Sequence, residues 1–376
     1  MNKVENYFKF CNEKDLINIK SFENKNTPKI SIITPVYNKE TTIIRYLKSI
    51  QNQTFEDIEI LLIDDKSNDN SKKIIEEIKK IDKRIILIKN NERRGTLVSK
   101  NIGVFKSLGE YLLFVDPDDL LTENILIHLY NLAKKNNFDL IRFYTYTGNA
   151  GLNLPGISYY LENKRISKPF LYFYLFYGFG KLFQLDFYIT NKLIKRNLFI
   201  SALNSINKYY LKQFMIDCED GLVNFMLYKL SESFFFYKKL GYYYIVTNKS
   251  ITYNMENFGK RLRSNFLYLK YLFENTKNNN IEKKMVFFVI SDIFSNHPDI
   301  FNIFNKLTRD SKFYLNVINK YLKSEFISLK TKKTLQKIVN SIKRKSWTFF
   351  IIIILVSHFF YMKILIYIMN KKENYV

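Results

Sequence analysis

Cysteine is scarce in this sequence, which holds only Cys11 and Cys218 among its 376 residues. Two cysteines are too few for a disulfide framework or a zinc cluster, and this number fits a reducing compartment. The first residues, MNKVENYFKFCNEK, contain no apolar stretch like that of a secretory signal, so we expect none there. The sequence also shows no internal repeat and no linker rich in proline or serine.

Acidic residues are also few, because 35 Asp and Glu face 59 Lys and Arg, which gives a net charge of +24. A basic balance favours polyanionic partners such as nucleic acid, anionic lipid headgroups or phosphate-bearing substrates. The lysines are scattered among abundant asparagine and isoleucine, so compositional drift explains the charge equally well. No nucleic-acid recognition motif accompanies the charge, and we expect no nucleic-acid partner.

Four short apolar runs without strict alternation follow one another: ISIITPV (30–36), IEILLID (58–64), RIILIK (84–89) and EYLLFVD (110–116). Such runs are typical of strands that are covered on both faces, as in a parallel sheet. Between them, residues 40–51, 71–81 and 96–108 carry apolar side chains at helical spacing. Strands that alternate with helices predict a doubly wound, mostly parallel α/β sheet with right-handed crossovers.

Polar side chains cluster where the predicted strands end. Asp65 follows the second strand, and Asp116, Asp118 and Asp119 follow the fourth. Ligands of such sheets bind at the carboxyl ends of the strands. Carboxylates this close repel one another unless a positive charge lies between them, and a hard divalent cation prefers oxygen ligands. The sequence therefore predicts a cation between Asp116 and Asp118, with a solvated acidic turn as the alternative.

In this order, the motifs resemble those of the family 2 glycosyltransferases. ISIITPVYNKE resembles the family's first strand and nucleotide-contacting turn, IDDKSNDNS its DDGSxD turn, and FVDPDD its DxD motif. TNKLIKRNLF (190–199) resembles the NKLYxxxLF segment, and CEDGLVNFML (218–227) resembles the EDxxFN helix. The sequence departs from the family at Lys66, where glycine is usual, and at Lys100, which replaces an arginine. The resemblance covers about residues 28–255 and implies the GT-A fold, a Rossmann-like doubly wound sheet.

The resemblance also implies roles for individual residues. Asp118 and Asp116 would bind Mn²⁺ or Mg²⁺, and Asp65 would accept a hydrogen bond from the ring N–H of uracil. Asp220 would be the general base, although charge at a helix N-terminus also explains Glu219 and Asp220. The residues expected to bind substrate are Pro35, Tyr37, Glu40, Asp65, Arg94, Lys100, Asp116 and Glu219. Solvated surface charge is an equal interpretation of Glu40 and Arg94.

Together these roles imply an inverting, metal-dependent glycosyltransferase. It would move a sugar from a nucleotide-sugar, expected to be UDP-linked, to a hydroxyl of a bacterial cell-surface glycan or a lipid-linked precursor. The alternative is a catalytically inactive, membrane-attached protein that keeps the GT-A fold as a scaffold. The presence of Asp116, Asp118 and Asp220 argues against that alternative.

The sequence divides into four predicted segments: an N-terminal arm (1–27), the catalytic domain (28–255), a C-terminal helical extension (256–345) and a hydrophobic helix (346–370). A membrane-spanning helix needs about 20 apolar residues, a length that the last segment just reaches. A helix in the membrane interface and a buried core helix are the alternatives. Because basic residues flank this segment, we expect it to hold the protein at the cytoplasmic face of a membrane.

Overall fold

The computed structural model describes residues 27–147, 151–153, 165–167, 188–215 and 219–245, and residues 264, 267, 268, 271 and 275. All of these belong to the first of two compact units, Met1–Ile293, and the second unit is Phe294–Val376. The predicted N-terminal arm, helical extension and hydrophobic helix lie outside the described residues, apart from a few single positions. Among the residues described, no helix combines the length and the apolar character that crossing a membrane requires.

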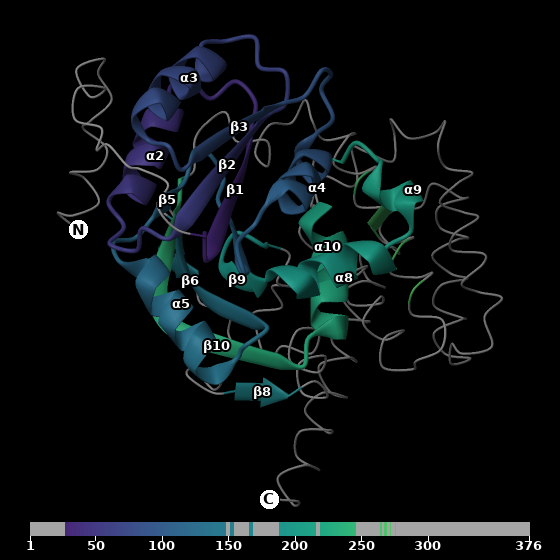
Figure 1. The fold of residues 1–376 in the computed structure, drawn as a ribbon. Coiled ribbons are helices and arrows are strands. Elements are labelled where there is room, and N and C mark those ends of the chain that lie inside the picture. Colours follow the sequence, from purple (N-terminus) through teal and green to yellow (C-terminus); the bar gives the residue numbers. More distant parts are fainter. Residues whose placement is uncertain are drawn as a thin grey trace, which may run out of the picture. The chain divides into compact units, whose positions relative to one another are not determined.

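Strand and helix alternate in the first part of the chain (Figure 1). The elements are β1 (Ile30–Val36), α2 (Ile43–Gln51), β2 (Ile58–Asp64), α3 (Ser71–Ile81), β3 (Ile85–Lys89), α4 (Thr96–Lys106) and β4 (Tyr111–Phe114). Their boundaries lie close to the predicted ones. The apolar runs and the helical periodicities are therefore confirmed as signals of secondary structure.

The second part of the chain is less regular. Its elements are β5 (Leu120–Leu121), α5 (Ile125–Asn136), β6 (Leu140–Thr147), β7 (Gly151–Asn153), β8 (Arg165–Ser167), β9 (Lys192–Lys195), α8 (Arg196–Ser205), α9 (Lys208–Leu211), α10 (Glu219–Leu230) and β10 (Ser233–Tyr244). The helix α10 begins where the acidic pair of the EDGLVNF segment stands, as the apolar pattern after that pair predicts.

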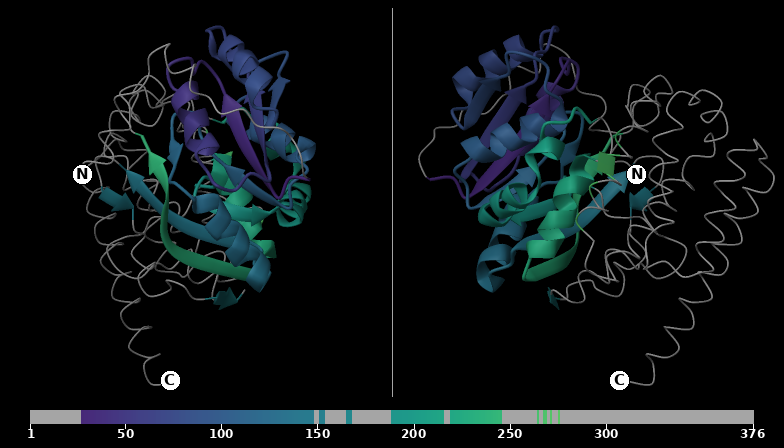
Figure 2. Two further views of the ribbon diagram at one scale, coloured as in Figure 1. Left: turned by 60° about the vertical axis from the view of Figure 1, so that its left-hand side comes forward. Right: turned by 90° about the vertical axis from the view of Figure 1, so that its right-hand side faces the viewer.

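The described strands form one ten-stranded sheet with the order β3-β2-β1-β4-β9-β6-β10-β5, in which β7 also pairs with β6 and β8 with β10. The strand β1 is parallel to β2 and β4, and β2 is parallel to β3. The strand β9 is antiparallel to both of its neighbours, β4 and β6. Figure 2 shows β10 as a long curved strand, which pairs in parallel with β6. The predicted α/β sheet is confirmed, with an antiparallel strand inserted near its centre.

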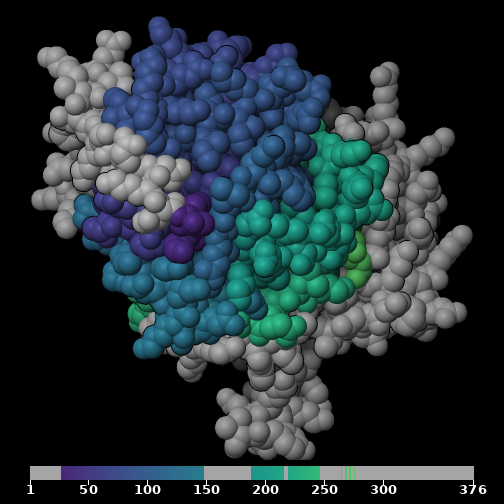
Figure 3. Space-filling model, in the orientation of Figure 1, coloured from purple at the N-terminus to yellow at the C-terminus, as the bar shows by residue number. Residues whose placement is uncertain are grey.

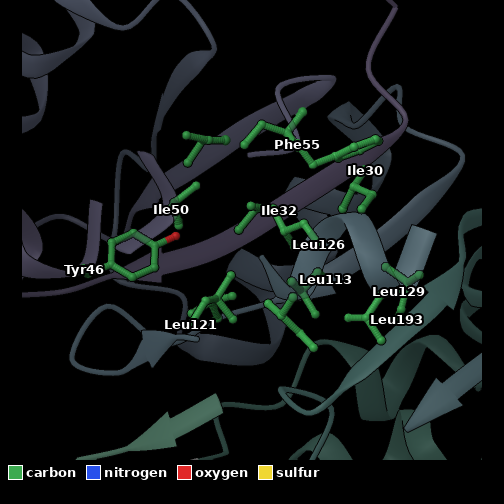
Figure 4. Close-up of a cluster of buried hydrophobic side chains, with 14 of the residues drawn as sticks. Ile30, Ile32, Tyr46, Ile50, Phe55, Leu113, Leu121, Leu126, Leu129 and Leu193 are labelled. Atoms are coloured by element: carbon green, nitrogen blue, oxygen red, sulfur yellow. The ribbon is translucent and has the colours of Figure 1, made fainter. Parts of the chain in front are cut away.

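Both faces of the sheet are covered, as continuous apolar runs predict. On one face, Ile32 lies in a buried cluster with Ile50 of α2 and Leu126 of α5 (Figure 4). Alternate residues of β1 point to the other face, where α4 lies. A Cβ atom added to Gly103 of α4 would stand 2.5 Å from Cγ2 of Ile33, so only glycine permits this close approach.

Because β1 lies between β2 and β4, the carboxyl ends of the three strands meet at one edge of the sheet. Val36 is opposite Asp64 in the β1–β2 register. The helix α4 also packs against α8 and α10, which joins the first part of the chain to the second. In the space-filling view these parts, blue and teal, form one continuous surface (Figure 3). The edge above β1, β2 and β4 is therefore within reach of side chains from α4 and α10.

Candidate active site

Two turns at this edge, residues 37–42 after β1 and 65–70 after β2, are joined by hydrogen bonds. Asn38 N donates to Ser67 Oγ at 3.1 Å, and Asn68 N donates to Asn38 Oδ1 at 3.0 Å. Glu40 Oε2 accepts from Asn70 N at 3.0 Å and from Asn70 Nδ2 at 2.9 Å. Asn70 precedes α3, and an acidic side chain suits a helix N-terminus. In this structure Glu40 therefore holds a helix end, and its contact with a nucleotide stays a prediction.

Asp65 organises the loop before α4. It is 4% exposed, and its Oδ1 accepts from Asn90 Nδ2 at 2.9 Å and from Arg94 N at 2.8 Å. Its Oδ2 accepts from Gly95 N at 2.8 Å. Each carboxylate oxygen has two lone pairs, so Oδ2 keeps one for a further donor. The structure thus adds a loop-holding role for Asp65 that the sequence did not indicate, and uracil binding there stays a prediction.

An arginine side chain, that of Arg93, is stacked on the ring of Tyr37. The guanidinium of Arg93 lies 3.9 Å from the centre of the Tyr37 ring and 5.6 Å from that of Phe214, which is a cation–π arrangement. The neighbouring Arg94 is exposed and forms an ion pair with Glu92 at 3.4 Å. In this structure Arg93 therefore covers a ring face of the tyrosine that is predicted to border the base.

The turn after β4 is anchored by Asp119, which is 2% exposed. Asp119 Oδ2 accepts from the Tyr242 hydroxyl at 2.7 Å, and Oδ1 accepts from Ile245 N at 2.8 Å. The same hydroxyl accepts from Asp116 N at 3.1 Å. Burial and the neighbouring Asp118 and Asp116 raise the pKa of Asp119 well above its usual value. Asp119 therefore fastens β10 to the acidic turn and leaves Asp116 and Asp118 as the two carboxylates available for a ligand.

Asp118 has a lysine partner. Lys39 Nζ lies 2.5 Å from Asp118 Oδ2, and the two side chains are 30% and 25% exposed. Arg45 Nη2, from α2, donates to the backbone oxygen of Asp118 at 3.1 Å. No sequence motif points to a role for Lys39, although it stands in the YNKE turn after β1. Asp118, the second aspartate of the DxD-like run, is therefore paired with a lysine in this structure.

The pKa of Asp116 is raised to about 6, above the usual range of an aspartate. Burial is the largest cause, and Asp118 and Asp220 act in the same direction, while Lys100 and Lys39 lower this pKa. Among the described residues, no group of three or more His, Cys, Asp or Glu side chains could hold a metal ion. Mg²⁺ commonly uses one or two carboxylates together with substrate phosphates, so Asp116 and Asp118 fit such a cation. The two carboxylates therefore suit a divalent cation whose other ligands would come from a phosphate-bearing substrate, and metal binding itself stays a prediction.

Asp220 lies in the first turn of α10 and meets Lys100 from α4. Lys100 Nζ is 2.7 Å from Asp220 Oδ1, and the side chains are only 3% and 14% exposed. Asp220 Oδ2 accepts from Ile189 N at 3.4 Å. Burial disfavours the ammonium form, but Asp220, Asp116 and Glu219 outweigh it and raise the pKa of Lys100 above its usual value. Lys100 is therefore a buried cation beside the predicted general base.

The structure brings the predicted Asp116, Asp118, Asp220 and Lys100 together at one edge, with Lys39 as an addition. The other predicted residues lie around them. Pro35 is half-buried near the end of β1, and Glu219 begins α10. Contacts of Pro35, Tyr37, Arg94 and Glu219 with a substrate stay predictions, since none of them is tested by the structure.

Lys66 stands where the motif usually has glycine, and its φ of +64° lies in the left-handed region. A residue with a Cβ loses roughly 1–2 kcal/mol there, although glycine has a greater entropy in the unfolded chain. We therefore expect Lys66→Gly to raise the free energy of unfolding by about 1 kcal/mol in urea titrations. Lys66→Ala keeps the Cβ and removes the charge. An equal gain from Lys66→Ala would show that charge, and not the backbone, is the cause.

Comparison with known proteins finds matches over the part of the chain that carries the strand-end motifs. The family model described as "Glycosyl transferase family 2" matches residues 31–200. Glycosyltransferase GlyG of Streptococcus pneumoniae is 32% identical over 124 residues, 32% of this chain and 41% of that protein. The GalNAc(5)-diNAcBac-PP-undecaprenol beta-1,3-glucosyltransferase of Campylobacter jejuni is 28% identical over 256 residues, 66% of this chain and 75% of that protein. The chain thus spans less than half the length of GlyG.

Solved structures show the same architecture. The crystal structure of S. aureus TarS 1-349 in complex with UDP-GlcNAc superposes with a TM-score of 0.60 at 16% identity, over 84% of this chain and 88% of that one. At this identity the likeness shows the fold alone. The family match runs from β1 into α8 and contains Asp65, Asp116 and Asp118. Residues 31–200 therefore carry a family 2 glycosyltransferase domain, and the described part of the chain has the GT-A fold of the TarS structures.

Proposed function

We propose that this protein transfers a sugar from a UDP-sugar to a hydroxyl group of a bacterial surface glycan or its lipid-linked precursor. The grouping of Asp116 and Asp118 with Asp220 at one edge of the sheet carries the proposal. The structural neighbour TarS has been crystallised with UDP and with UDP-GlcNAc. The Campylobacter jejuni relative is named for glucosyl transfer to an undecaprenol-PP-linked glycan. These names support a UDP-sugar donor and a glycan or lipid-linked acceptor.

The proposed reaction inverts the anomeric carbon. The acceptor oxygen forms a bond to this carbon while the bond to the diphosphate oxygen breaks, and UDP leaves with the electron pair. The Asp220 carboxylate takes the proton of the acceptor hydroxyl, which is general-base catalysis. Asp220 stands in the first turn of α10 with one oxygen paired to Lys100, and its other oxygen would serve the acceptor. Inversion follows because the acceptor attacks from the side opposite the leaving group.

Metal dependence is part of the proposal. Asp118 and Asp116 would hold Mn²⁺ or Mg²⁺ together with the diphosphate oxygens. When bound, such a cation offsets the charge that develops on the leaving diphosphate. Lys39, which contacts Asp118, and Arg45, which contacts the backbone of the same turn, add positive charge on the donor side. The donor side of the edge is therefore basic around a pair of metal-binding carboxylates.

The nucleotide would lie over the turns after β1 and β2. Asp65 keeps a lone pair on Oδ2 for the uracil N–H, because Gly95 N takes only one. The base would stack on the Tyr37 ring face that Arg93 now covers. Binding would then replace one stacking contact with another and release the Arg93 guanidinium toward the diphosphate, where it suits phosphate oxygens.

A panel of nucleotide sugars tests the proposed function. With Mn²⁺ or Mg²⁺ and a lipid-linked glycan acceptor, we expect release of UDP from one of the UDP-sugars and none in excess chelator. Release from a donor with another nucleotide would contradict the uracil assignment. If no donor in the panel is turned over while UDP still binds, the inactive scaffold is the better description.

We further propose that residues 346–370, outside the described part of the chain, attach the enzyme to the cytoplasmic face of a membrane. The segment is apolar, and each of Lys343, Arg344 and Lys345 adds roughly 1 kcal/mol near an anionic surface. We expect the chain truncated after Ser341 to be soluble and to retain transfer to a soluble acceptor analogue. Fractionation at low and high salt compares it with the full chain. Full-length protein that stays soluble at every salt concentration, or a truncated form that unfolds, contradicts the attachment.

A further inference from the structure

Lys100 is a buried lysine whose ammonium group meets the proposed base. Its side chain is 3% exposed, and Nζ lies 2.7 Å from Asp220 Oδ1. A buried ammonium is tolerated only when it is paired and hydrogen-bonded, because it has lost its hydration. The two residues are 120 positions apart in the chain, and the contact forms where α4 packs against α10. The pair is therefore a product of the fold and fixes one oxygen of the carboxylate.

The second oxygen of Asp220 is held less firmly. Asp220 Oδ2 accepts from Ile189 N at 3.4 Å, a long hydrogen bond that leaves a lone pair of this oxygen for another donor. A carboxylate is planar, so a firm contact at Oδ1 also sets the direction of Oδ2. The ion pair of Lys100 with Oδ1 thus also fixes the direction in which Oδ2 of Asp220 points. An acceptor hydroxyl would donate to Oδ2 in the proposed reaction.

Lys100 also acts electrostatically on a carboxylate of the donor side. Its charge interacts with Asp220 and Glu219 of α10 and with Asp116 after β4. Asp220 raises the pKa of Asp116, and the Lys100 ammonium acts in the opposite direction. A neutral residue at position 100 would remove this compensating charge.

The remaining charged groups near Asp220 have other partners. The helix α8, which packs against α10, begins with Arg196, and Arg196 Nε donates to Ser107 Oγ at 3.1 Å. Lys192, at the start of β9, donates to the backbone oxygen of Tyr188 and, at 3.0 Å, to Asn191 Oδ1. The turn 188–191 itself contains no charged residue. Lys100 is therefore the cation that meets the base.

We propose that Lys100 is the positioning residue of the general base: its ion pair orients the Asp220 carboxylate, and Lys100 does not itself bind the donor. This inference rests on the proposed function, in which Asp220 is the base. It revises the expectation that Lys100 contacts the substrate. The partner of Lys100, Asp220, is on the acceptor side of the proposed reaction.

Kinetics of Lys100→Met test the inference on the full-length enzyme. We expect kcat to fall about tenfold to a hundredfold, because a misdirected catalytic group loses up to about that factor. The donor KM and the Kd for UDP should change by less than about twofold, since the ion pair of Lys100 is with Asp220 and not with a residue of the donor side. Lys100→Arg, which restores the charge, should recover most of kcat.

A double variant separates this role from donor binding. In the Asp220→Asn background, Lys100→Met should cause no further loss of kcat, because a residue that acts only through Asp220 has nothing left to position. Additional loss in the double variant, accompanied by weaker UDP binding, would overturn the inference and assign Lys100 to the donor. If Asp220→Asn alone keeps full turnover, the base assignment itself has failed. The two failures are therefore distinguishable.

Folding controls accompany these measurements. Lys195→Met removes another partly buried lysine, which pairs with Asp139 at 3.3 Å away from the site, and should keep wild-type kinetics. If Lys100→Met does not fold, Lys100→Gln keeps a hydrogen-bond donor without the charge and takes its place. The same fall in kcat, without a change in the Kd for UDP, is expected from it. Wild-type kcat in a folded Lys100→Gln protein would overturn the inference.

Discussion

Replacing Asp118 with asparagine is expected to abolish sugar transfer almost completely and to weaken metal-dependent binding of UDP. The asparagine keeps the shape of the side chain and removes the charge that a divalent cation requires. Asp116 alone cannot compensate, because a single carboxylate gives the cation fewer oxygen ligands and less negative charge than the pair does. Release of UDP during turnover measures the first effect. Calorimetry of UDP with and without Mn²⁺ measures the second.

Two further variants identify the cause of that loss. Asp118→Asn also breaks the ion pair with Lys39, whereas Lys39→Met breaks the same pair and leaves the carboxylate. Lys39→Met should therefore retain metal-dependent UDP binding. Asp57→Asn, just before β2 at the opposite edge of the sheet, controls for a general effect of the substitution and should remain active. Full activity of Asp118→Asn in excess chelator would remove this residue from any metal site.

Local sequence patterns were sufficient to predict the parallel half of the sheet. Strands β1 and β2 are short apolar runs, and α2 and α3 carry apolar stripes with the helical period, so neighbouring residues alone define them. The strand β9 is different. It pairs between β4 and β6, which are far from it in sequence, and its four residues carry no period long enough to indicate a strand. Such pairing depends on the complete fold.

In the candidate site, too, some features could be predicted from the sequence and others could not. The aspartates after β2 and β4 could be placed together because the carboxyl ends of parallel strands share an edge. The contacts of Lys39 with Asp118 and of Lys100 with Asp220 could not, since each joins side chains from separate elements. Only part of the role of Asp65 could be predicted from the sequence. Its motif indicates a ligand contact, yet the structure adds bonds to the 90–95 loop that only a folded chain reveals.

Replacing Asp220 with asparagine is expected to lower turnover by roughly 10²–10⁴-fold, the usual contribution of a general base. An amide cannot accept the proton of the acceptor hydroxyl as a carboxylate does. The affinity for UDP should hardly change, because Asp220 lies in the first turn of α10 and not in the turns after β1 and β2. Steady-state kinetics and calorimetry with UDP measure the two quantities.

Loss of stability must be separated from loss of chemistry, since Asp220→Asn leaves the buried Lys100 without its carboxylate partner. Asp139→Asn is a matched control. Asp139 is 19% exposed, pairs with Lys195 and accepts from Ser233 N at 3.1 Å, yet it lies outside the site. Both variants should lower the melting temperature, but only Asp220→Asn should lower kcat per folded molecule. Calorimetry that shows lost UDP binding for Asp220→Asn would assign this residue to the donor and leave the base unidentified.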